Sequence, residues 1–376
     1  MKVGITGQNG FIGTHLYNLL GMKEDILRID FRREYFQDAQ KLEEFVTSCD
    51  TIVHLAALNR HNDPEEIYTT NVSLVQKIIS ACEQTNARPH IIFSSSTQEE
   101  QDNPYGRSKR KGREIFDTWA EKVGAQFTGL VIPNVYGPFG EPFYNSVIST
   151  FCYKLTHNEE PEVHVDNSLD LIFVNELIEI IFQFISINNS NKDQVNKVLT
   201  HYVQPTATMK VSELLTALRS FKSLYLHNGE IPELPDDTYL NLFNTFRCYI
   251  PEDHFPVKYD KHEDQRGAFV EITRAETPGQ TSFSVTKLGI TRGNHFHTRK
   301  AERFAVIKGK AKIQLRRIGT NKVIEYTLDG NSPSYVDMPI WFTHNITNIG
   351  DDDLYTIFWV NEPYNPDDPD TYYEEV

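Results

Sequence analysis

The stretch GITGQNGFIG, residues 4–13, decides the fold of the N-terminal half of the chain. It follows a short apolar segment typical of a buried strand and opens a segment with apolar residues at helical spacing. Glycines in this context permit a tight turn and let backbone amides approach a pyrophosphate at the positive end of the helix. We therefore predict a dinucleotide site here, with a glycine-rich turn lacking a ligand as the structural alternative. The predicted cofactor residues of this turn are Gly7, Gly10, Phe11, Ile12 and Gly13.

Apolar segments recur along the first half and change in character in the second. ILRID (26–30), TIVHLAA (51–57), HIIFSSS (90–96) and FTGLVIPNVYG (127–137) are separated by helical stretches, which predicts a parallel, doubly wound α/β sheet. From about residue 250 the segments are short and alternating, which is typical of an all-β barrel or sandwich. We place the boundary near IPEDHFPVKYD (250–260) and predict domains over residues 1–248 and 249–376.

Composition restricts the class of protein. The chain has 376 residues, a net charge of −15 and 39% hydrophobic residues, and no apolar run approaches the ~18 residues that a membrane span needs. The negative charge argues against bulk nucleic-acid binding, and the start lacks a signal peptide. Four scattered cysteines without a CxxC pair suit reduced thiols. We expect a cytoplasmic protein that acts on a small molecule, without membrane or nucleic-acid partners.

The segment RIDFRRE (28–34) bears on the choice of nucleotide. Asp30 can hold a ribose diol, as in NAD sites, whereas Arg32 and Arg33 can pair with the additional phosphate of NADP. An arginine just past the strand end favours NADPH, with Arg32 as its ligand; the alternative is that both arginines are surface residues.

A Tyr-x-x-x-Lys pair in NPYGRSK predicts a proton donor. Tyr105 and Lys109 are four residues apart and so share one helix face. Ser96 at the end of the preceding strand supplies a hydroxyl, with Thr97 as its rival. Lys109 can lower the pKa of the phenol electrostatically, so that Tyr105 exchanges a proton with a carbonyl oxygen while a cofactor moves a hydride.

GNHFHTRKAERF (293–304) and PIWFTHNITN (339–348) carry the candidate metal ligands. Strand alternation puts two histidines on one face, and a glutamate and a third histidine from neighbouring strands complete the set. Three nitrogens and one carboxylate suit zinc first, with Fe(II), Mn(II) or Ni(II) as alternatives. Such a closed site can also serve only to staple the barrel. The predicted ligands are His295, His297, Glu302 and His344.

Residues 1–245 resemble an extended short-chain dehydrogenase/reductase of the nucleotide-sugar type. The resemblance rests on the glycine turn, HLAA (54–57), the Ser, Tyr and Lys above and PNVYGP (133–138). It implies that Ser96 orients the carbonyl, Tyr105 donates the proton and Lys109 binds the ribose. It also implies a cofactor site that includes Leu55, Ala56 and Asn71. The sequence departs from many relatives in having Val131 and Ile132 where an arginine precedes the Pro-Asn motif.

The histidine pattern resembles the two cupin motifs, with Trp341 where glycine is usual, and EDQRGAFVEI (263–272) resembles the Asp-x-Arg-Gly stretch of cupin epimerases. The whole chain resembles the bifunctional bacterial capsular-polysaccharide enzymes on the route to UDP-N-acetyl-L-fucosamine. The resemblance implies that the cupin epimerises carbon 3 of a UDP-4-keto-6-deoxy-N-acetyl-hexosamine. The reductase then uses NADPH to give UDP-2-acetamido-2,6-dideoxy-L-talose. A zinc ion and a homodimer are also implied.

Two other functions remain open at this point. In one, the chain is a nucleotide-sugar 4-ketoreductase whose cupin is only a binding or dimerisation module. In the other, the N-terminal half is an epimerase or dehydratase that retains its cofactor through the cycle.

Overall fold

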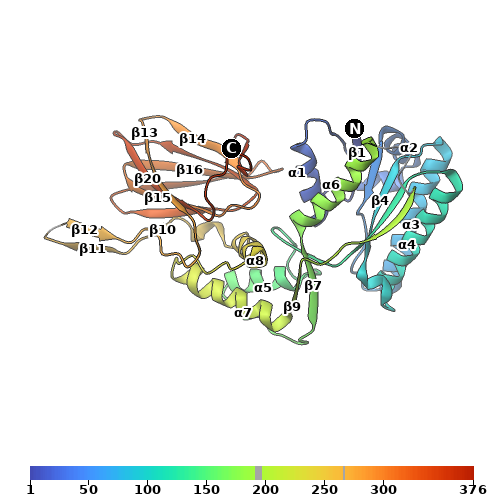
Figure 1. Cartoon of the computed structure of the whole chain (residues 1–376), viewed down its shortest axis with the longest axis horizontal. Helices are drawn as coiled ribbons and strands as arrows, with labels where there is room; N and C mark the ends of the chain where they lie inside the picture. Colours follow the sequence, from blue (N-terminus) through green and yellow to red (C-terminus); the bar gives the residue numbers. More distant parts are fainter. Residues whose placement is uncertain (191–196, 266) are drawn as a thin grey trace. The chain divides into compact units, whose positions relative to one another are not determined.

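The computed structural model describes residues 1–190, 197–265 and 267–376. Two compact units make up the described chain (Figure 1). The first comprises Met1–Tyr136, Phe143–Ser146 and Ser168–Met209, and the second comprises Gly137–Pro142, Val147–Asn167 and Lys210–Val376. No helix in these described ranges is long and apolar enough to cross a lipid bilayer.

The first unit is built on a parallel sheet with the strand order β2-β1-β3-β4-β5-β8. Its central strands are buried along their whole length, as expected for a parallel sheet covered on both faces. A smaller sheet, β6-β7-β9, lies in the same unit. The strands are β1 (Lys2–Thr6), β2 (Leu27–Ile29), β3 (Thr51–His54), β4 (His90–Ser96), β5 (Phe127–Ile132), β6 (Asn134–Tyr136), β7 (Ser168–Phe173), β8 (Val198–Tyr202) and β9 (Ala207–Lys210).

Helices cover both faces of the large sheet. One apolar core joins α1 and α6 to the sheet, and a second joins α2, α3 and α4 to its other face. The helices are α1 (Phe11–Gly21), α2 (Ala39–Ser48), α3 (Pro64–Thr85), α4 (Pro104–Val123) and α6 (Val174–Ser190), with short 3₁₀ turns at Arg33–Gln37 and Thr97–Glu100. The predicted α/β Rossmann fold is confirmed. Because β2 and β3 flank β1 on opposite sides, the strand order reverses at β1, where such folds bind nucleotides.

The second unit contains two five-stranded antiparallel sheets, β10-β18-β15-β20-β13 and β17-β16-β19-β14-β21. Their inner faces meet in an apolar core that includes Val306, Ile313 and Leu354, and the predicted all-β cupin fold is confirmed. The strands are β10 (Val257–Lys258), β11 (Lys261–Asp264), β12 (Gly267–Val270), β13 (Gln280–Thr286), β14 (Thr291–Phe296), β15 (Glu302–Lys308), β16 (Lys310–Arg317), β17 (Val323–Asp329), β18 (Ser334–Met338), β19 (Phe342–Asn348), β20 (Leu354–Val360) and β21 (Tyr372–Tyr373).

The stretch that resembles the Asp-x-Arg-Gly motif does not join either sheet. Strands β11 and β12 pair with each other as a separate hairpin, and Phe269 in it is 67% exposed. The arginine of the motif, residue 266, lies outside the described residues.

Three helices pack in the same compact unit as the barrel: α5 (Val147–Thr156), α7 (Val211–Phe221) and α8 (Asp237–Arg247), with a helical turn at Lys222–His227 and a 3₁₀ turn at Glu252–His254. Arg303 and Asp337 form a buried ion pair on the barrel. The Tyr225 hydroxyl donates a hydrogen bond to the Asp337 carboxylate at 2.5 Å. Residues 210–247 pack in the same compact unit as the barrel. Compact packing does not define a domain of the sequence, so the boundary at residue 248 stays a prediction.

Candidate active site and metal centre

The glycine turn is shaped by close backbone approaches. Gly7 has φ +80°, and a Cβ there would lie 2.9 Å from the amide nitrogen of Ala56. A Cβ on Gly13 would lie only 2.1 Å from the Gly7 carbonyl oxygen. Gly10 is the N-cap of α1 and places no side chain over its first amides. The turn and the helix N-terminus therefore offer backbone donors to an anionic group, as a pyrophosphate requires.

Phe11 and Ile12 begin α1 immediately after this turn, and Leu55 and Ala56 follow β3 beside it. The amide of Leu55 donates to the Thr6 carbonyl at 3.1 Å, which holds the HLAA segment against the end of β1. The structure thus brings the predicted cofactor residues of both segments together at the strand-order reversal.

The residues that bear on NAD against NADP differ in their surroundings. Asp30 accepts a hydrogen bond from the Tyr17 hydroxyl at 3.0 Å. Arg32 is exposed and follows β2 with its backbone extended. Both side chains are exposed, so the guanidinium can pair with the additional phosphate of NADP and the carboxylate can hold a ribose diol.

Tyr105 and Lys109 lie together on α4, with the Lys109 amine 5.6 Å from the centre of the Tyr105 ring. Lys109 is 3% exposed and donates to the Ser94 carbonyl at 2.8 Å. Burial lowers the pKa of Lys109 to about 7. Burial raises the pKa of Tyr105 to about 12, and Tyr144 adds to this rise. Burial therefore sets the direction of this shift, and the lowering that Lys109 can exert on the phenol stays a prediction. Tyr105 stays protonated at neutral pH, which suits a proton donor.

Three serines and a threonine lie at the end of β4, and Ser96 is the most exposed of the three serines. The Ser94 hydroxyl donates to the His54 carbonyl at 3.2 Å, and the Ser95 hydroxyl donates to Glu99 at 2.6 Å. Ser96 is half-buried and accepts from the Gln98 amide at 3.2 Å, which leaves its own hydrogen free to donate. Thr97, the rival, is exposed.

Asn71 acts through hydrogen bonds within the protein. It is 5% exposed; its oxygen accepts from the Leu58 amide at 2.6 Å, and its nitrogen donates to the Leu58 carbonyl and the Ser108 hydroxyl, each at 3.0 Å. Ser108 donates in turn to the Tyr105 carbonyl at 2.7 Å. Asn71 thereby ties the segment after β3 to the turn of α4 that carries Tyr105.

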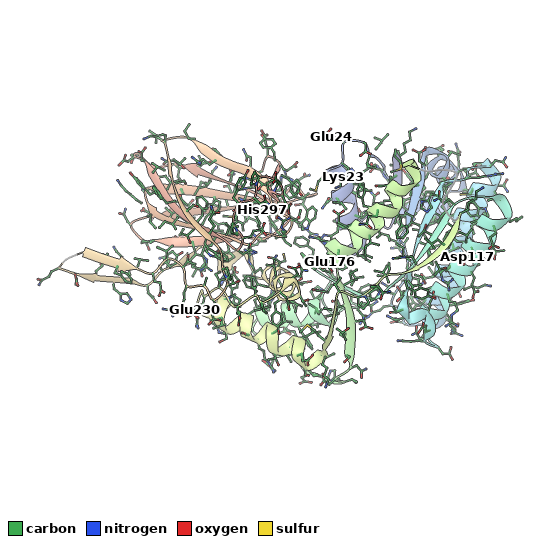
Figure 2. All side chains as sticks on the ribbon, in the orientation of Figure 1. Lys23, Glu24, Asp117, Glu176, Glu230 and His297 are labelled. Atoms are coloured by element: carbon green, nitrogen blue, oxygen red, sulfur yellow. The ribbon has the colours of Figure 1, made fainter. Side chains whose placement is uncertain are left out.

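The four predicted metal ligands converge in the barrel, where His297 is labelled in Figure 2. His295 on β14 pairs directly with His344 on β19, Glu302 begins β15 in the other sheet, and His297 lies just past β14. Their ligand atoms all lie within 4.8 Å of one another. The Glu302 carboxylate is 3.0 Å from His297 Nε2 and 3.3 Å from His344 Nε2. Ligands about 2 Å from a tetrahedral ion are separated by roughly 3.3 Å, so the cluster fits zinc.

The electrostatics of the cluster also fit a cation. His297 Nε2, His344 Nε2 and Glu302 Oε2 are buried and, among the described residues, have no partner other than one another. Burial opposes ionisation of Glu302, but the His297 and His344 contacts hold the pKa of its carboxyl well below the usual range. Burial lowers the pKa of His295 to about 4, and the two other histidines add to this fall. An ionised Glu302 and a neutral His295 have the forms in which these groups bind metals, whereas the contact with Glu302 outweighs burial and raises the pKa of His297, whose proton a bound ion would displace.

The backbone conformation of Trp341 accounts for the glycine that is usual at this position of the motif. Its φ is +61°, in the left-handed region that favours glycine. Its amide donates to the His297 carbonyl at 2.8 Å, and its ring stacks on Phe296 with centroids 5.7 Å apart. The buried indole stabilises a conformation that its backbone disfavours.

Two acidic residues that no sequence motif indicates support these sites. Glu99 is buried and binds Arg113 at 2.9 Å, which fastens the turn after Ser96 to α4. Asp370 is 1% exposed although it lies in a run of acidic residues. The partners of Asp370 are about 70 residues away, so no local signal in the sequence distinguishes it from its neighbours.

Comparisons with known proteins agree with this architecture. Residues 3–198 match the model of the NAD dependent epimerase/dehydratase family, and residues 262–372 match the polysaccharide biosynthesis C-terminal domain. The UDP-2-acetamido-2,6-beta-L-arabino-hexul-4-ose reductase of Pseudomonas aeruginosa is 32% identical over 99% of this chain and 98% of its own.

Solved structures give the same result. The capsular polysaccharide assembling protein CapF from Staphylococcus aureus is 34% identical, with all of both chains covered and a TM-score of 0.63. A UDP-N-acetylglucosamine 4-epimerase from Methanobrevibacter ruminantium, 21% identical with a TM-score of 0.53, covers 66% of this chain and 98% of its own and shares the fold. The chain therefore belongs to the NAD dependent epimerase/dehydratase family and carries in addition a segment that matches the polysaccharide biosynthesis C-terminal domain.

Proposed function

We propose that this protein performs two consecutive reactions on a nucleotide sugar. The cupin epimerises carbon 3 of a UDP-4-keto-6-deoxy-N-acetyl-hexosamine, and the N-terminal unit reduces the carbon 4 ketone with NADPH to UDP-2-acetamido-2,6-dideoxy-L-talose, a precursor of capsular or O-antigen polysaccharide. One observation carries the proposal: a single chain holds both sets of residues. The Lys109 amine lies 5.6 Å from the centre of the Tyr105 ring, and the four candidate metal-ligand atoms lie within 4.8 Å of one another.

A bound nicotinamide would supply the hydride for the reduction of carbon 4. The glycine turn and the N-terminus of α1 would hold the pyrophosphate, and Arg32 would hold the additional phosphate of NADPH. Ser96 donates a hydrogen bond to the carbonyl oxygen. Tyr105 transfers its proton to that oxygen as negative charge develops on it. Lys109 would bind the ribose, and its hydrogen bond to the Ser94 carbonyl holds its amine near Tyr105.

In the epimerisation, the proton on carbon 3 is acidic because its loss gives an enolate, in which the carbon 4 oxygen carries the negative charge. His295, His297, Glu302 and His344 would hold a zinc ion, which supplies positive charge where negative charge develops. Reprotonation from the opposite face inverts carbon 3. Reduction at carbon 4 then removes the acidity and fixes the configuration.

A second candidate is a 4-ketoreductase whose cupin serves only as a binding or dimerisation module. Two observations favour it: four protein side chains together fill a tetrahedral coordination set, and the name of the Pseudomonas relative states a reductase alone.

One experiment separates the two candidates. The protein is incubated with NADPH and the 4-keto sugar in deuterated water, while absorbance at 340 nm and deuterium at carbon 3 are followed. Two-step chemistry gives NADPH oxidation with deuterium incorporation, whereas a plain reductase gives oxidation alone. An epimerase or dehydratase that retains its cofactor would consume no NADPH in proportion to product.

Variants assign the steps to residues. Tyr105→Phe should stop NADPH oxidation but leave deuterium exchange, and Tyr202→Phe, at a tyrosine 55% exposed, is the matched control. His344→Ala should lose the metal and the exchange. Exchange at the normal rate in a metal-free His344→Ala protein would exclude a catalytic role for the ion.

We propose that the enzyme is a cytoplasmic homodimer with zinc in the cupin. Sedimentation equilibrium, fractionation of cells and metal analysis of the purified protein test these three expectations separately.

A further inference from the structure

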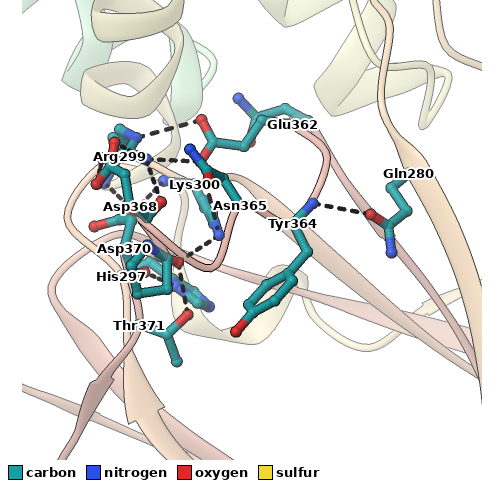
Figure 3. Close-up of polar contacts among 12 residues, drawn as sticks. Gln280, His297, Arg299, Lys300, Glu362, Tyr364, Asn365, Asp368, Asp370 and Thr371 are labelled. Carbon is teal, nitrogen blue, oxygen red and sulfur yellow. Dashed lines mark hydrogen bonds and ion pairs between the residues drawn. The ribbon is translucent and has the colours of Figure 1, made fainter.

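The acidic C-terminal segment, residues 361–376, is folded into the barrel. Glutamates and aspartates in such a run are ordinarily solvated, yet Asp370 is buried. Strand β21 pairs with β14, with Tyr373 opposite the predicted ligand His295. Figure 3 shows this segment beside His297.

The carboxylate of Asp370 organises the turn that follows His297. One oxygen accepts from the Thr298 amide at 2.9 Å and the Thr298 hydroxyl at 2.7 Å; the other accepts from the amides of Arg299 at 3.0 Å and Lys300 at 3.1 Å (Figure 3). Four donors on one buried carboxylate fix the backbone between His297 and Glu302.

The backbone of Asp370 also contacts His297 directly. Its carbonyl oxygen accepts the hydrogen of His297 Nδ1, so in the neutral ring the lone pair is on Nε2, the atom 3.0 Å from Glu302. A hydrogen bond to the remote nitrogen selects the tautomer and the ring orientation of a metal-bound histidine.

Neighbouring contacts hold the segment in place. Lys300 donates to the Pro369 carbonyl at 2.5 Å, and Arg299 pairs with Glu362 at 3.0 Å and Asp368 at 2.9 Å. Each link joins the turn after His297 to residues 362–370, so displacement of the segment would release the ligand turn.

We propose that Asp370 is a positioning residue of the metal centre and that the C-terminal segment is a built part of that centre. It holds His297 with Nε2 directed at the other ligands, so that the site is preorganised before the ion binds. The proposal rests on the metal site of the preceding section.

Zinc affinity of the full-length protein tests this, measured by competition with a chromophoric chelator. Asp370→Asn leaves the size of the side chain but turns an amide group towards backbone donors. We expect affinity to fall about 10- to 100-fold, the usual effect of losing a partner of a ligand. Asp367→Asn makes the same change at an exposed residue of the same segment and should bind as the wild type does.

Each outcome is informative. If wild type binds no zinc, the metal site itself is wrong; if Asp370→Asn binds as tightly as wild type, only the role of Asp370 is wrong. If Asp370→Asn does not fold, Thr298→Val removes one donor and retains the three amides, and it should weaken zinc binding by a smaller factor. Visible absorption of the cobalt-substituted proteins gives a second readout, since a reoriented His297 changes the ligand field. Wild-type affinity and spectrum in Thr298→Val would then overturn the proposal.

Discussion

The buried amine of Lys109 should lower the free energy of unfolding of the protein at neutral pH. Burial lowers its pKa from 10.5 to about 7, so between these values the unfolded chain binds a proton that the folded chain does not. The free energy of unfolding contributed by this group therefore increases as pH rises from 7 to 10.5. At pH 7 the shift corresponds to a penalty of about 4 kcal/mol.

Lys109→Met removes the charge and preserves much of the side-chain volume. The Ser94 carbonyl loses the donor at 2.8 Å, which costs about 2 kcal/mol. The net expectation is a gain of about 2 kcal/mol at pH 7. For a unit of this size that corresponds to a rise of about 5 °C in Tm, accompanied by loss of reductase activity.

Calorimetry at pH 7 and pH 9.5 measures both the gain and its pH dependence, and the advantage of the variant should shrink at the higher pH. Lys77→Met is the control, because Lys77 also donates to a carbonyl, that of Phe36 at 2.8 Å, from an exposed position. A Lys109→Met protein less stable than wild type at pH 7, or one whose advantage is independent of pH, would refute the reasoning.

Three further substitutions test other parts of the structure. Gly13→Ala would place a methyl 2.1 Å from a backbone oxygen of the turn, so we expect NADPH binding, followed by fluorescence, to fall below detection. Glu99→Gln leaves the guanidinium of Arg113 without its carboxylate and should cost about 3 kcal/mol with a lower kcat, measured by urea unfolding and NADPH oxidation. Asp337→Asn breaks the buried ion pair with Arg303, whose atoms lie 2.8 Å apart. It should destabilise the barrel by about 3 to 5 kcal/mol, which calorimetry would detect as a lower Tm for unfolding of the unit that contains the barrel.

The sequence predicts those parts of the sites that depend on local spacing. Tyr105 and Lys109 are four apart on a helix, and His295 and His297 are two apart around the end of a strand, so periodicity alone places each pair on one face. The glycine turn is local in part, because Gly13 approaches the nearby Gly7 carbonyl, whereas Gly7 approaches Ala56 beyond β3.

Long-range contacts are what the sequence could not give. Asp370 reaches the 298–300 turn across about 70 residues, and neither propensity nor periodicity indicates which of several aspartates does so. The raised pKa of Tyr105 has no signal in the sequence, because the burial of a side chain depends on the whole unit.

The packing of residues 210–247 bears on whether the two proposed activities can be separated by cutting the chain. The buried Arg303 bonds Asp337 through two nitrogens and donates a third hydrogen bond, at 2.6 Å, to the carbonyl of Gly229. Arg247, on α8, donates to the Met338 carbonyl at 2.7 Å. A barrel that began at residue 249 would lack these partners and leave charged groups of its wall unsatisfied, which is costly in a buried site. Loss of activity in such a fragment would therefore report misfolding of the barrel wall, so point substitutions within the intact chain are the better means of assigning each reaction to its unit.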